Sequence, residues 1–174
     1  YTTIDFTGDG IGSTILRVDY NTTGETTFIN DTNTDCATAV CRGPRSVRDM
    51  TFTMLNPVQA TGHAVITVTD PYVHITNTHF EDWFSLGIVI DGNVNGDAGR
   101  FVISNNSCHL VRLYCVRAIN APKGLISNNR FDNSGTSDGA VTLQGVSHTT
   151  VVTNNVFNGT SGMQMESLTQ GTPN

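Results

Sequence analysis

Two acidic segments of the chain carry side chains that could hydrolyse a glycosidic bond. Glu81 and Asp82 lie in the sequence FEDWF, and Asp132 follows the phenylalanine of ISNNRFD. Glycoside hydrolysis needs two carboxyl groups beside the scissile bond, one protonated as an acid and one that activates water or attacks directly. We therefore predict Glu81, Asp82 and Asp132 as candidate catalytic residues. The alternative is that FEDWF is a loop whose carboxylates are solvated.

The FEDWF segment also contains Trp83, the only tryptophan of the chain. An exposed tryptophan offers a flat apolar face on which a sugar ring can stack. We predict that Trp83 contacts carbohydrate. The alternative is that its ring covers the edge of the core or makes a subunit contact.

A second polar segment, DGNVNGDAG at residues 91–99, resembles part of a calcium-binding loop. Asp91, Asn93 and Asn95 occupy alternate positions and a glycine follows, as in D-x-N-x-N-G. Such loops wrap hard oxygen ligands around one cation. Position twelve, which should be a bidentate glutamate, is Val102, so Asp97 would have to substitute in a looser site. We predict calcium as the candidate metal and no required cofactor, with a simple polar turn as the alternative.

The composition places these residues on strands rather than on helices. The chain has 174 residues, enough for one domain, with 17 glycines and 37% hydrophobic residues. Its many Asn, Thr and Gly residues and the near absence of Ala/Glu/Lys/Leu-rich windows favour short strands joined by tight turns. We therefore predict an all-β protein.

The charge and hydropathy of the chain argue against two kinds of partner. The formal net charge is −6, and Lys and Arg are scattered over nine positions, so no basic stripe could neutralise phosphates. No window approaches the roughly 20 apolar residues of a membrane helix, and the start shows no signal-peptide pattern. We expect neither nucleic-acid binding nor membrane insertion. Because the chain begins without methionine, we also expect a processed form or a fragment.

A short phrase of the type ISNNRF recurs along the chain. Aligned on its first apolar residue, it begins at Ile75, Ile103, Ile126 and Val152, with a weaker copy at Val47. The separations are 28, 28, 23 and 26 residues from the first copy to the last. A period of about 20 to 30 residues with variable insertions is typical of a solenoid, in which each coil buries its apolar side against its neighbours.

A second strand-like segment follows each phrase. The segments are HAVITVTD, GIVIDG, YCVRAIN, GAVTLQG and GMQMESL. Each alternates apolar and polar residues, the period of two expected when one face of a strand is buried. Leucine-rich repeats would add a leucine ladder and a helix per turn, and neither is visible. We predict a single-stranded right-handed parallel β-helix of about five to six coils, with an opening segment and first coil at 1–45 and repeated coils at 46–174.

In this fold the repeated apolar residues would stack inward, about 4.8 Å apart. Five positions after the isoleucines, a second inward stack would contain Phe80, Cys108, Phe131 and Phe157. The asparagine pair between the two stacks would lie at a bend, where Asn tolerates left-handed backbone and its amide can bond to the next coil. We therefore interpret the following asparagines as structural rather than ligand-binding: Asn105, Asn106, Asn128, Asn129, Asn154 and Asn155.

The same alignment positions the candidate site residues. Glu81, His109, Asp132 and Asn158 follow the phenylalanine stack in successive coils. Glu81 and Asp132 would then be two coils apart, roughly 9.6 Å along the axis, close to the upper end of the separation of about 6.5 to 9.5 Å in inverting glycosidases. Outward residues of the second segment form another candidate groove. We predict that carbohydrate contacts come from Trp83, His109, Arg117, Gln144 and Glu166.

The four cysteines fall into two close pairs. Cys36 with Cys41 and Cys108 with Cys115 are spaced so that two local disulfides are feasible. For the first pair a disulfide and free thiols are equally acceptable. For the second pair we favour free cysteines, because Cys108 replaces a stacked phenylalanine and free Cys packs well as a small hydrophobe.

The repeated phrases, their spacing and the opening IDFTGDGIGSTILRVD resemble the right-handed parallel β-helix family that includes pectate lyases, polygalacturonases and bacteriophage tailspikes. The resemblance covers nearly the whole chain and implies the fold. A pectate lyase is disfavoured, because the outward row lacks the dense cluster of Asp, Lys and Arg that would hold polygalacturonate.

The richness in Thr, Asn and Gly and the low charge are most similar to a tailspike or tail fibre. That resemblance implies a homotrimer on a virion tail, or an extracellular protein, that binds and in some cases hydrolyses bacterial surface polysaccharide as a glycoside hydrolase. The alternative is a non-catalytic structural or receptor-binding segment of a viral tail appendage, or a secreted or surface adhesin.

Overall fold

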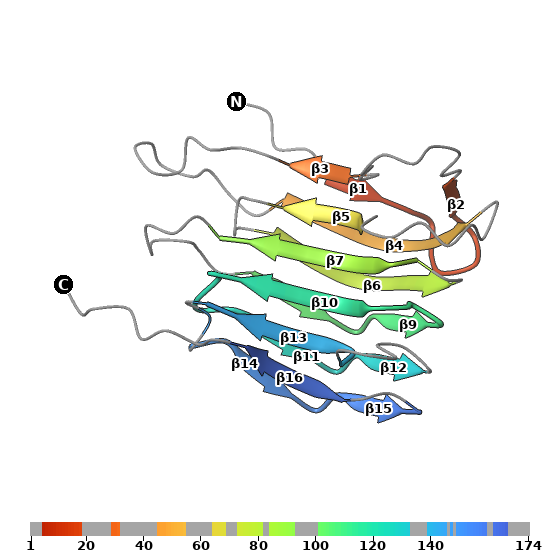
Figure 1. Cartoon of the computed structure of the whole chain (residues 1–174). Coiled ribbons are helices and arrows are strands. Elements are labelled where there is room, and N and C mark those ends of the chain that lie inside the picture. Colours follow the sequence, from red (N-terminus) through yellow and green to blue (C-terminus); the bar gives the residue numbers. More distant parts are fainter. Residues whose placement is uncertain are drawn as a thin grey trace.

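The computed structural model describes most of the repeated region and parts of the N-terminal region. The described residues are 5–18, 29–31, 45–54, 64–68, 73–81, 84–92, 101–132, 139–145, 147, 149–159 and 162–166. They form strands and turns, and every strand pairing among them is parallel (Figure 1). Within these ranges no helix is long and apolar enough to cross a membrane. The prediction of an all-β parallel solenoid is confirmed.

The larger of two sheets has ten strands and contains the repeated phrases. Two long strands run through the whole phrase, and in later coils the phrase divides at its asparagine pair into two short strands. The long strands are β4 (Arg45–Met54) and β6 (Val73–Glu81). The short strands are β8 (Val102–Ser104), β9 (Ser107–His109), β11 (Leu125–Ser127), β12 (Arg130–Asp132), β14 (Val151–Thr153) and β15 (Val156–Asn158). The first coil adds β1 (Asp5–Thr7) and β2 (Ile15–Val18), which pair with the two halves of β4.

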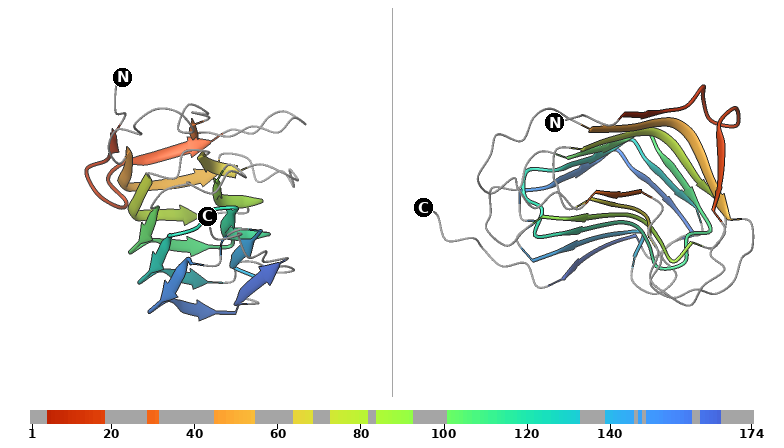
Figure 2. Two further views of the ribbon diagram at one scale, coloured as in Figure 1. Left: turned by 90° about the vertical axis from the view of Figure 1, so that its left-hand side faces the viewer. Right: turned by 90° about the horizontal axis from the view of Figure 1, so that it is seen from above.

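The second sheet has six strands, one from each of six successive coils. Its strands are β3 (Ile29–Asp31), β5 (Ala64–Val68), β7 (Leu86–Asp91), β10 (Tyr114–Ile119), β13 (Val141–Gln144) and β16 (Met163–Glu166). Seen along the stack, strands of successive coils superpose and the two sheets enclose the interior (Figure 2). The alternating sequences of these segments explain the arrangement, because one face of each strand enters the core.

The register of the larger sheet is the one that the repeated phrase predicts. Ile75 pairs with Ile103 and Ile103 with Ile126, and all three side chains have no exposed surface. The phenylalanine stack also holds, since Phe80 pairs with Cys108, which pairs with Phe131. Stacked phenylalanine rings in adjacent coils lie 5.3 Å and 5.1 Å apart between centroids. Each coil thus buries its apolar side against the next coil.

The first asparagine of each corner pair adopts a left-handed backbone. The φ angles are +57° at Asn105, +56° at Asn128 and +54° at Asn154. This conformation is costly for most L-residues, and asparagine tolerates it better than most. The three side chains are exposed. These asparagines therefore turn the chain from one strand into the next without entering the core.

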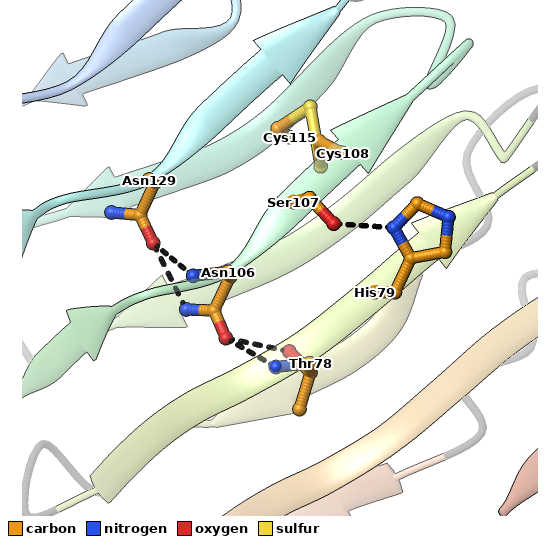
Figure 3. The surroundings of a disulfide bond; sticks show 7 residues. All are labelled: Thr78, His79, Asn106, Ser107, Cys108, Cys115 and Asn129. Carbon is orange, nitrogen blue, oxygen red and sulfur yellow. Dashed lines mark hydrogen bonds between the residues drawn. A yellow bond between two sulfur atoms is a disulfide. The ribbon is translucent and has the colours of Figure 1, made fainter. Parts of the chain in front are cut away.

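The second asparagine of each pair forms a ladder between coils (Figure 3). The Asn106 Oδ1 atom accepts hydrogen bonds from the Thr78 backbone N–H at 2.9 Å and the Thr78 hydroxyl at 2.8 Å. The Asn129 Oδ1 atom accepts one from the Asn106 backbone N–H at 2.9 Å, and Asn155 receives the equivalent bond from Asn129. The amide groups also bond to one another at 3.0 to 3.1 Å. The structural interpretation of the asparagines is confirmed, with different roles for the two members of a pair.

A disulfide joins Cys108 to Cys115, with the two Cα atoms 6.1 Å apart (Figure 3). Both side chains are buried, so Cys108 keeps its place in the phenylalanine stack while it is bonded. The interpretation of this pair as free cysteines was therefore wrong. The reason is that the chain turns from β9 into β10 within seven residues, which brings the two inward-facing cysteines together. Cys36 and Cys41 lie outside the described residues.

Candidate functional site

The outward side chains of β6, β9, β12 and β15 form a polar surface, which we call the β6–β15 face. Its two rows follow the strand register, on either side of the buried phenylalanine stack. One row contains His79, Ser107, Arg130 and Val156, and the other contains Glu81, His109, Asp132 and Asn158. Alternation along each strand puts both rows outside because the residue between them faces the core. The face thus repeats polar groups from coil to coil.

An ion pair organises one part of this face. The Arg130 Nε atom donates to the Asp132 Oδ2 atom at 2.5 Å. The hydrogen bond from Arg130 lowers the pKa of Asp132 below its usual value against an opposing effect of partial burial, and a hydrogen bond with Asn158 and the nearby His109 lower it further. Asp132 is therefore an ionised carboxylate at neutral pH. It is suited to accept hydrogen bonds and does not act as an acid at neutral pH.

A second cluster lies on β6 and β9. The His79 Nδ1 atom is in hydrogen-bond contact with the Ser107 hydroxyl (Figure 3). On the other side of the same ring, the Nε2 atom lies 3.7 Å from the Glu81 Oε2 atom. The side chains of His79 and Glu81 are 23% and 48% exposed. A hydroxyl, an imidazole and a carboxylate are therefore neighbours in space, in that order, on a solvent-accessible surface.

The predicted catalytic carboxylates Glu81 and Asp132 both lie on the β6–β15 face. Glu81 pairs with His109, which pairs with Asp132, so the carboxylates belong to strands separated by one intervening strand. Two strand spacings correspond to roughly 9.6 Å between the backbones, as the repeat indicates. Asp82 and Trp83 lie outside the described residues. Their proposed catalytic and sugar-stacking roles stay predictions.

Three residues of this face are absent from the sequence-based prediction of the site. His79, Ser107 and Arg130 each lie two positions before a residue of the row that contains Glu81, His109 and Asp132. Residues two apart on a strand share a face. That period was therefore the signal that could have identified them, once the inward position of the phenylalanine stack was known.

The other predicted carbohydrate-binding residues lie on the six-stranded sheet. Asp91, Gln144 and Glu166 occupy equivalent positions in their coils, and Arg117 lies two positions before that row. The structure thus separates His109, on the ten-stranded sheet, from Arg117, Gln144 and Glu166. The sequence analysis places Arg117, Gln144 and Glu166 in a second candidate groove, which agrees with their positions on the six-stranded sheet. Their contacts with carbohydrate stay predictions.

Arg117 is the centre of this second surface. Its Nη2 atom donates to the Gln144 side-chain oxygen at 2.8 Å, and its guanidinium lies 5.3 Å from the centre of the Tyr114 ring. Burial raises the pKa of Asp91, and the positive charge of Arg117 opposes that effect. The contacts that Arg117 makes are with side chains of the same surface. They stabilise the outer side of the sheet.

The candidate calcium loop falls mostly outside the described residues. Asp91 ends β7 and is partly exposed, whereas Asn93, Asn95 and Asp97 are not described. In the part of the chain that is described, no group of three or more His, Cys, Asp or Glu side chains could hold a metal ion. The calcium site stays a prediction.

The stacked parallel strands, two sheets and inward apolar columns define a parallel β-solenoid. A family model described as "Right handed beta helix region" matches residues 63–173, well over half of the chain. The protein belongs to this right-handed β-helix family. Comparison with curated proteins and comparison with solved structures each found no match.

Proposed function

We propose that the protein binds a bacterial surface polysaccharide along the β6–β15 face, as a tailspike-type β-helix of a virion tail or an extracellular protein. The observation that supports this proposal best is the row of Glu81, His109, Asp132 and Asn158, aligned in four successive coils. Polar groups of this row recur about every 4.8 Å along the solenoid. A linear polymer of polar units can lie along such a row and use several of them at once.

The charges of the face suit a carbohydrate better than a nucleic acid. The Arg130–Asp132 pair presents both signs, and Glu81 adds a further carboxylate. The chain as a whole is acidic, with a formal charge of −6. A polyphosphate would be repelled, whereas sugar hydroxyls can both donate to carboxylates and accept from arginine and histidine.

Hydrolysis of the bound polysaccharide is the catalytic form of this proposal. The ionised Asp132 would activate water, and Glu81, one strand beyond His109, would donate a proton to the leaving oxygen. Two strand spacings leave room for the sugar and the water. The non-catalytic alternative, in which the same face only binds a receptor and the coils act as a rigid rod, uses the same surface without cleavage.

The experiment is to incubate the protein with lipopolysaccharide or capsule from a panel of bacteria, measure binding, and analyse the supernatant for oligosaccharides by mass spectrometry. We expect binding to at least one polysaccharide and discrete products from it. Glu81→Gln and Asp132→Asn should retain binding and abolish the products, with Asp9→Asn, an exposed carboxylate between β1 and β2, as the matched control. Binding without products from any bound glycan would favour the non-catalytic alternative, and no binding to any glycan would overturn the proposal.

Two further parts of this proposal concern assembly and metal. We propose a homotrimer, which sedimentation equilibrium would test: a single species of three times the chain mass supports it, and a monomer contradicts it. Calcium is proposed at the 91–99 loop. A rise in melting temperature on calcium addition that is lost in Asp91→Ala would support this site, and an unchanged melting temperature would contradict it.

A further inference from the structure

The His79 side chain lies between a serine hydroxyl and a glutamate carboxylate. We propose that Ser107, His79 and Glu81 form an acyl-transfer triad that cleaves ester-linked acyl groups. Ser107 would be the nucleophile, His79 the general base and Glu81 the group that stabilises the charged imidazole. The triad requires an ionised Glu81 and is therefore an alternative to glycoside hydrolysis with Glu81 as the acid. Only the choice of substrate, an acyl ester carried by a bound glycan, rests on the proposed binding function of the face.

The strand pairing holds the three groups in place. His79 pairs directly with Ser107 across the parallel β6 and β9 strands, and both side chains point outward. The His79 Nδ1 atom contacts the Ser107 hydroxyl oxygen. A nucleophile in hydrogen-bond reach of a base is the structural signature of covalent catalysis, provided that a third group orients the base.

The third group comes from the same strand as the base. Glu81 lies two residues after His79, so its side chain is on the same face of β6. Its Oε2 atom is 3.7 Å from the His79 Nε2 atom, on the side of the ring that faces away from Ser107. At this distance the carboxylate stabilises the imidazolium that forms when His79 takes up a proton. With 48% of the Glu81 side chain and 23% of the His79 side chain exposed, a substrate can approach from solvent.

The buried disulfide next to Ser107 supports the geometry. Cys108 follows Ser107 in β9 and faces the core. It is bonded to Cys115 in β10, a strand of the six-stranded sheet (Figure 3). On the preceding side, Asn106 is buried and bonded to coils above and below. Ser107 is therefore an outward residue between two fixed inward neighbours. The backbone of Ser107 is thus held on both sides, with this residue paired opposite His79.

The reaction consists of two balanced steps. In the first, the Ser107 oxygen attacks the ester carbonyl carbon and its proton passes to the His79 Nδ1 atom. The bond between this carbon and the alcohol oxygen then breaks, and the alcohol leaves with the proton from His79. In the second, water attacks the acyl-serine, His79 takes the proton of the water and returns it to Ser107, and the carboxylic acid leaves. One ester and one water become one acid and one alcohol.

Arg130 is placed to stabilise the negative oxygen that develops in both steps. It pairs with Ser107 on the neighbouring β12 strand and shares its outward row. Asp132 binds its Nε atom, and 60% of the side chain is exposed. A positive charge next to the nucleophile can stabilise the oxyanion. In this proposal Arg130 contacts the reacting oxygen, and Asp132 positions Arg130.

A fluorophosphonate ester tests the triad directly, because it forms a stable bond with a serine that a neighbouring base activates. We expect one adduct per wild-type chain in the intact mass, and peptide mapping should place it on Ser107. His79→Gln should slow the labelling about 100-fold or more, the usual contribution of a general base, while Ser104→Ala, an outward serine of β8, should leave it unchanged. Absence of an adduct on Ser107, or labelling that His79→Gln does not slow, would overturn the proposal.

Hydrolysis of p-nitrophenyl acetate provides a second measurement. The wild-type rate should exceed that of Ser107→Ala by about 100-fold or more, and melting curves of both proteins would show that the variant is folded. Equal rates in the two folded proteins would contradict the triad. The triad and the proposed function can fail separately. Glycan binding without labelling at Ser107 would contradict only the triad, and labelling at Ser107 without glycan binding would contradict only the proposed function.

Discussion

Replacing Asn106 with alanine removes the central member of the asparagine ladder. The Asn106 side chain is 6% exposed and accepts hydrogen bonds from the Thr78 backbone N–H and hydroxyl. It donates to the Ile75 carbonyl at 2.9 Å and to the Asn129 side-chain oxygen at 3.1 Å. Alanine keeps the backbone and the first side-chain carbon and loses all four of these contacts. The substitution therefore tests whether the amide ladder holds the coils together.

The expected cost follows from the groups that lose their partner. Thr78 is fully buried, so its backbone N–H cannot turn to water, and the Ile75 carbonyl loses a buried donor at the same corner. A buried polar group left without a partner costs about 1–3 kcal/mol, and these two backbone groups alone give about 2–6 kcal/mol. This is a large share of the about 5–15 kcal/mol by which a domain is usually stable.

Urea unfolding followed by circular dichroism measures this loss. Asn105→Gly is the matched control, because it is the adjacent residue, its side chain is exposed, and glycine accepts the φ of +57° without strain. We expect Asn106→Ala to lower the free energy of unfolding by about 2–6 kcal/mol and Asn105→Gly by less than about 1 kcal/mol. If Asn106→Ala were as stable as the control, the hydrogen bonds of the second asparagine of each pair would not hold adjacent coils together.

Three other substitutions test separate features of the fold. The Arg130 hydrogen bond holds the pKa of Asp132 below its usual 3.8, so this carboxylate stabilises the fold above that pH and loses its contribution as the pH falls. In acid titrations, Arg130→Gln should therefore make the free energy of unfolding less dependent on pH between pH 5 and about 2. An unchanged slope of this free energy against pH would contradict the stabilising role of the ion pair. Cys115→Ala removes a disulfide that closes a short loop and should cost about 2–3 kcal/mol in urea unfolding, whereas reductant should lower the wild type to the same level and leave the variant unchanged. In Gly124→Ala the new Cβ would lie 2.0 Å from the Phe101 ring, so the melting temperature should fall by several degrees; an unchanged value would show that the ring can move aside.

The sequence was sufficient for the architecture because the repeat has a physical meaning at each position. Isoleucines at equivalent positions of the repeat must all be buried in one core. The pairing of Ile75, Ile103 and Ile126 follows from that requirement. The prediction that Glu81 and Asp132 lie on the two strands next to that of His109 is confirmed for the same reason. Register in a solenoid is set by the buried residues, and the exposed ones are carried with them.

Other features depend on contacts that a repeat does not encode. The two cysteines of the second pair meet because the turn from β9 to β10 is short, and spacing alone did not decide between a disulfide and free thiols. The His79–Ser107 contact arises between coils, from residues 28 positions apart that differ in type from coil to coil. Non-repeating side chains are therefore where sequence reasoning is weakest and where the proposed chemistry lies.

The proposed function requires polysaccharide to bind on the β6–β15 face. Its most direct test is the dissociation constant for the bacterial polysaccharide that the wild type binds, measured for three folded proteins by biolayer interferometry. A variant with His109→Gln and Arg130→Gln should bind at least about 10-fold more weakly, equivalent to a loss of about 1.4 kcal/mol, and Glu166→Gln should bind as the wild type does. Unchanged binding in the double variant, with a loss in Glu166→Gln, would place the polysaccharide on the six-stranded sheet and contradict the claim.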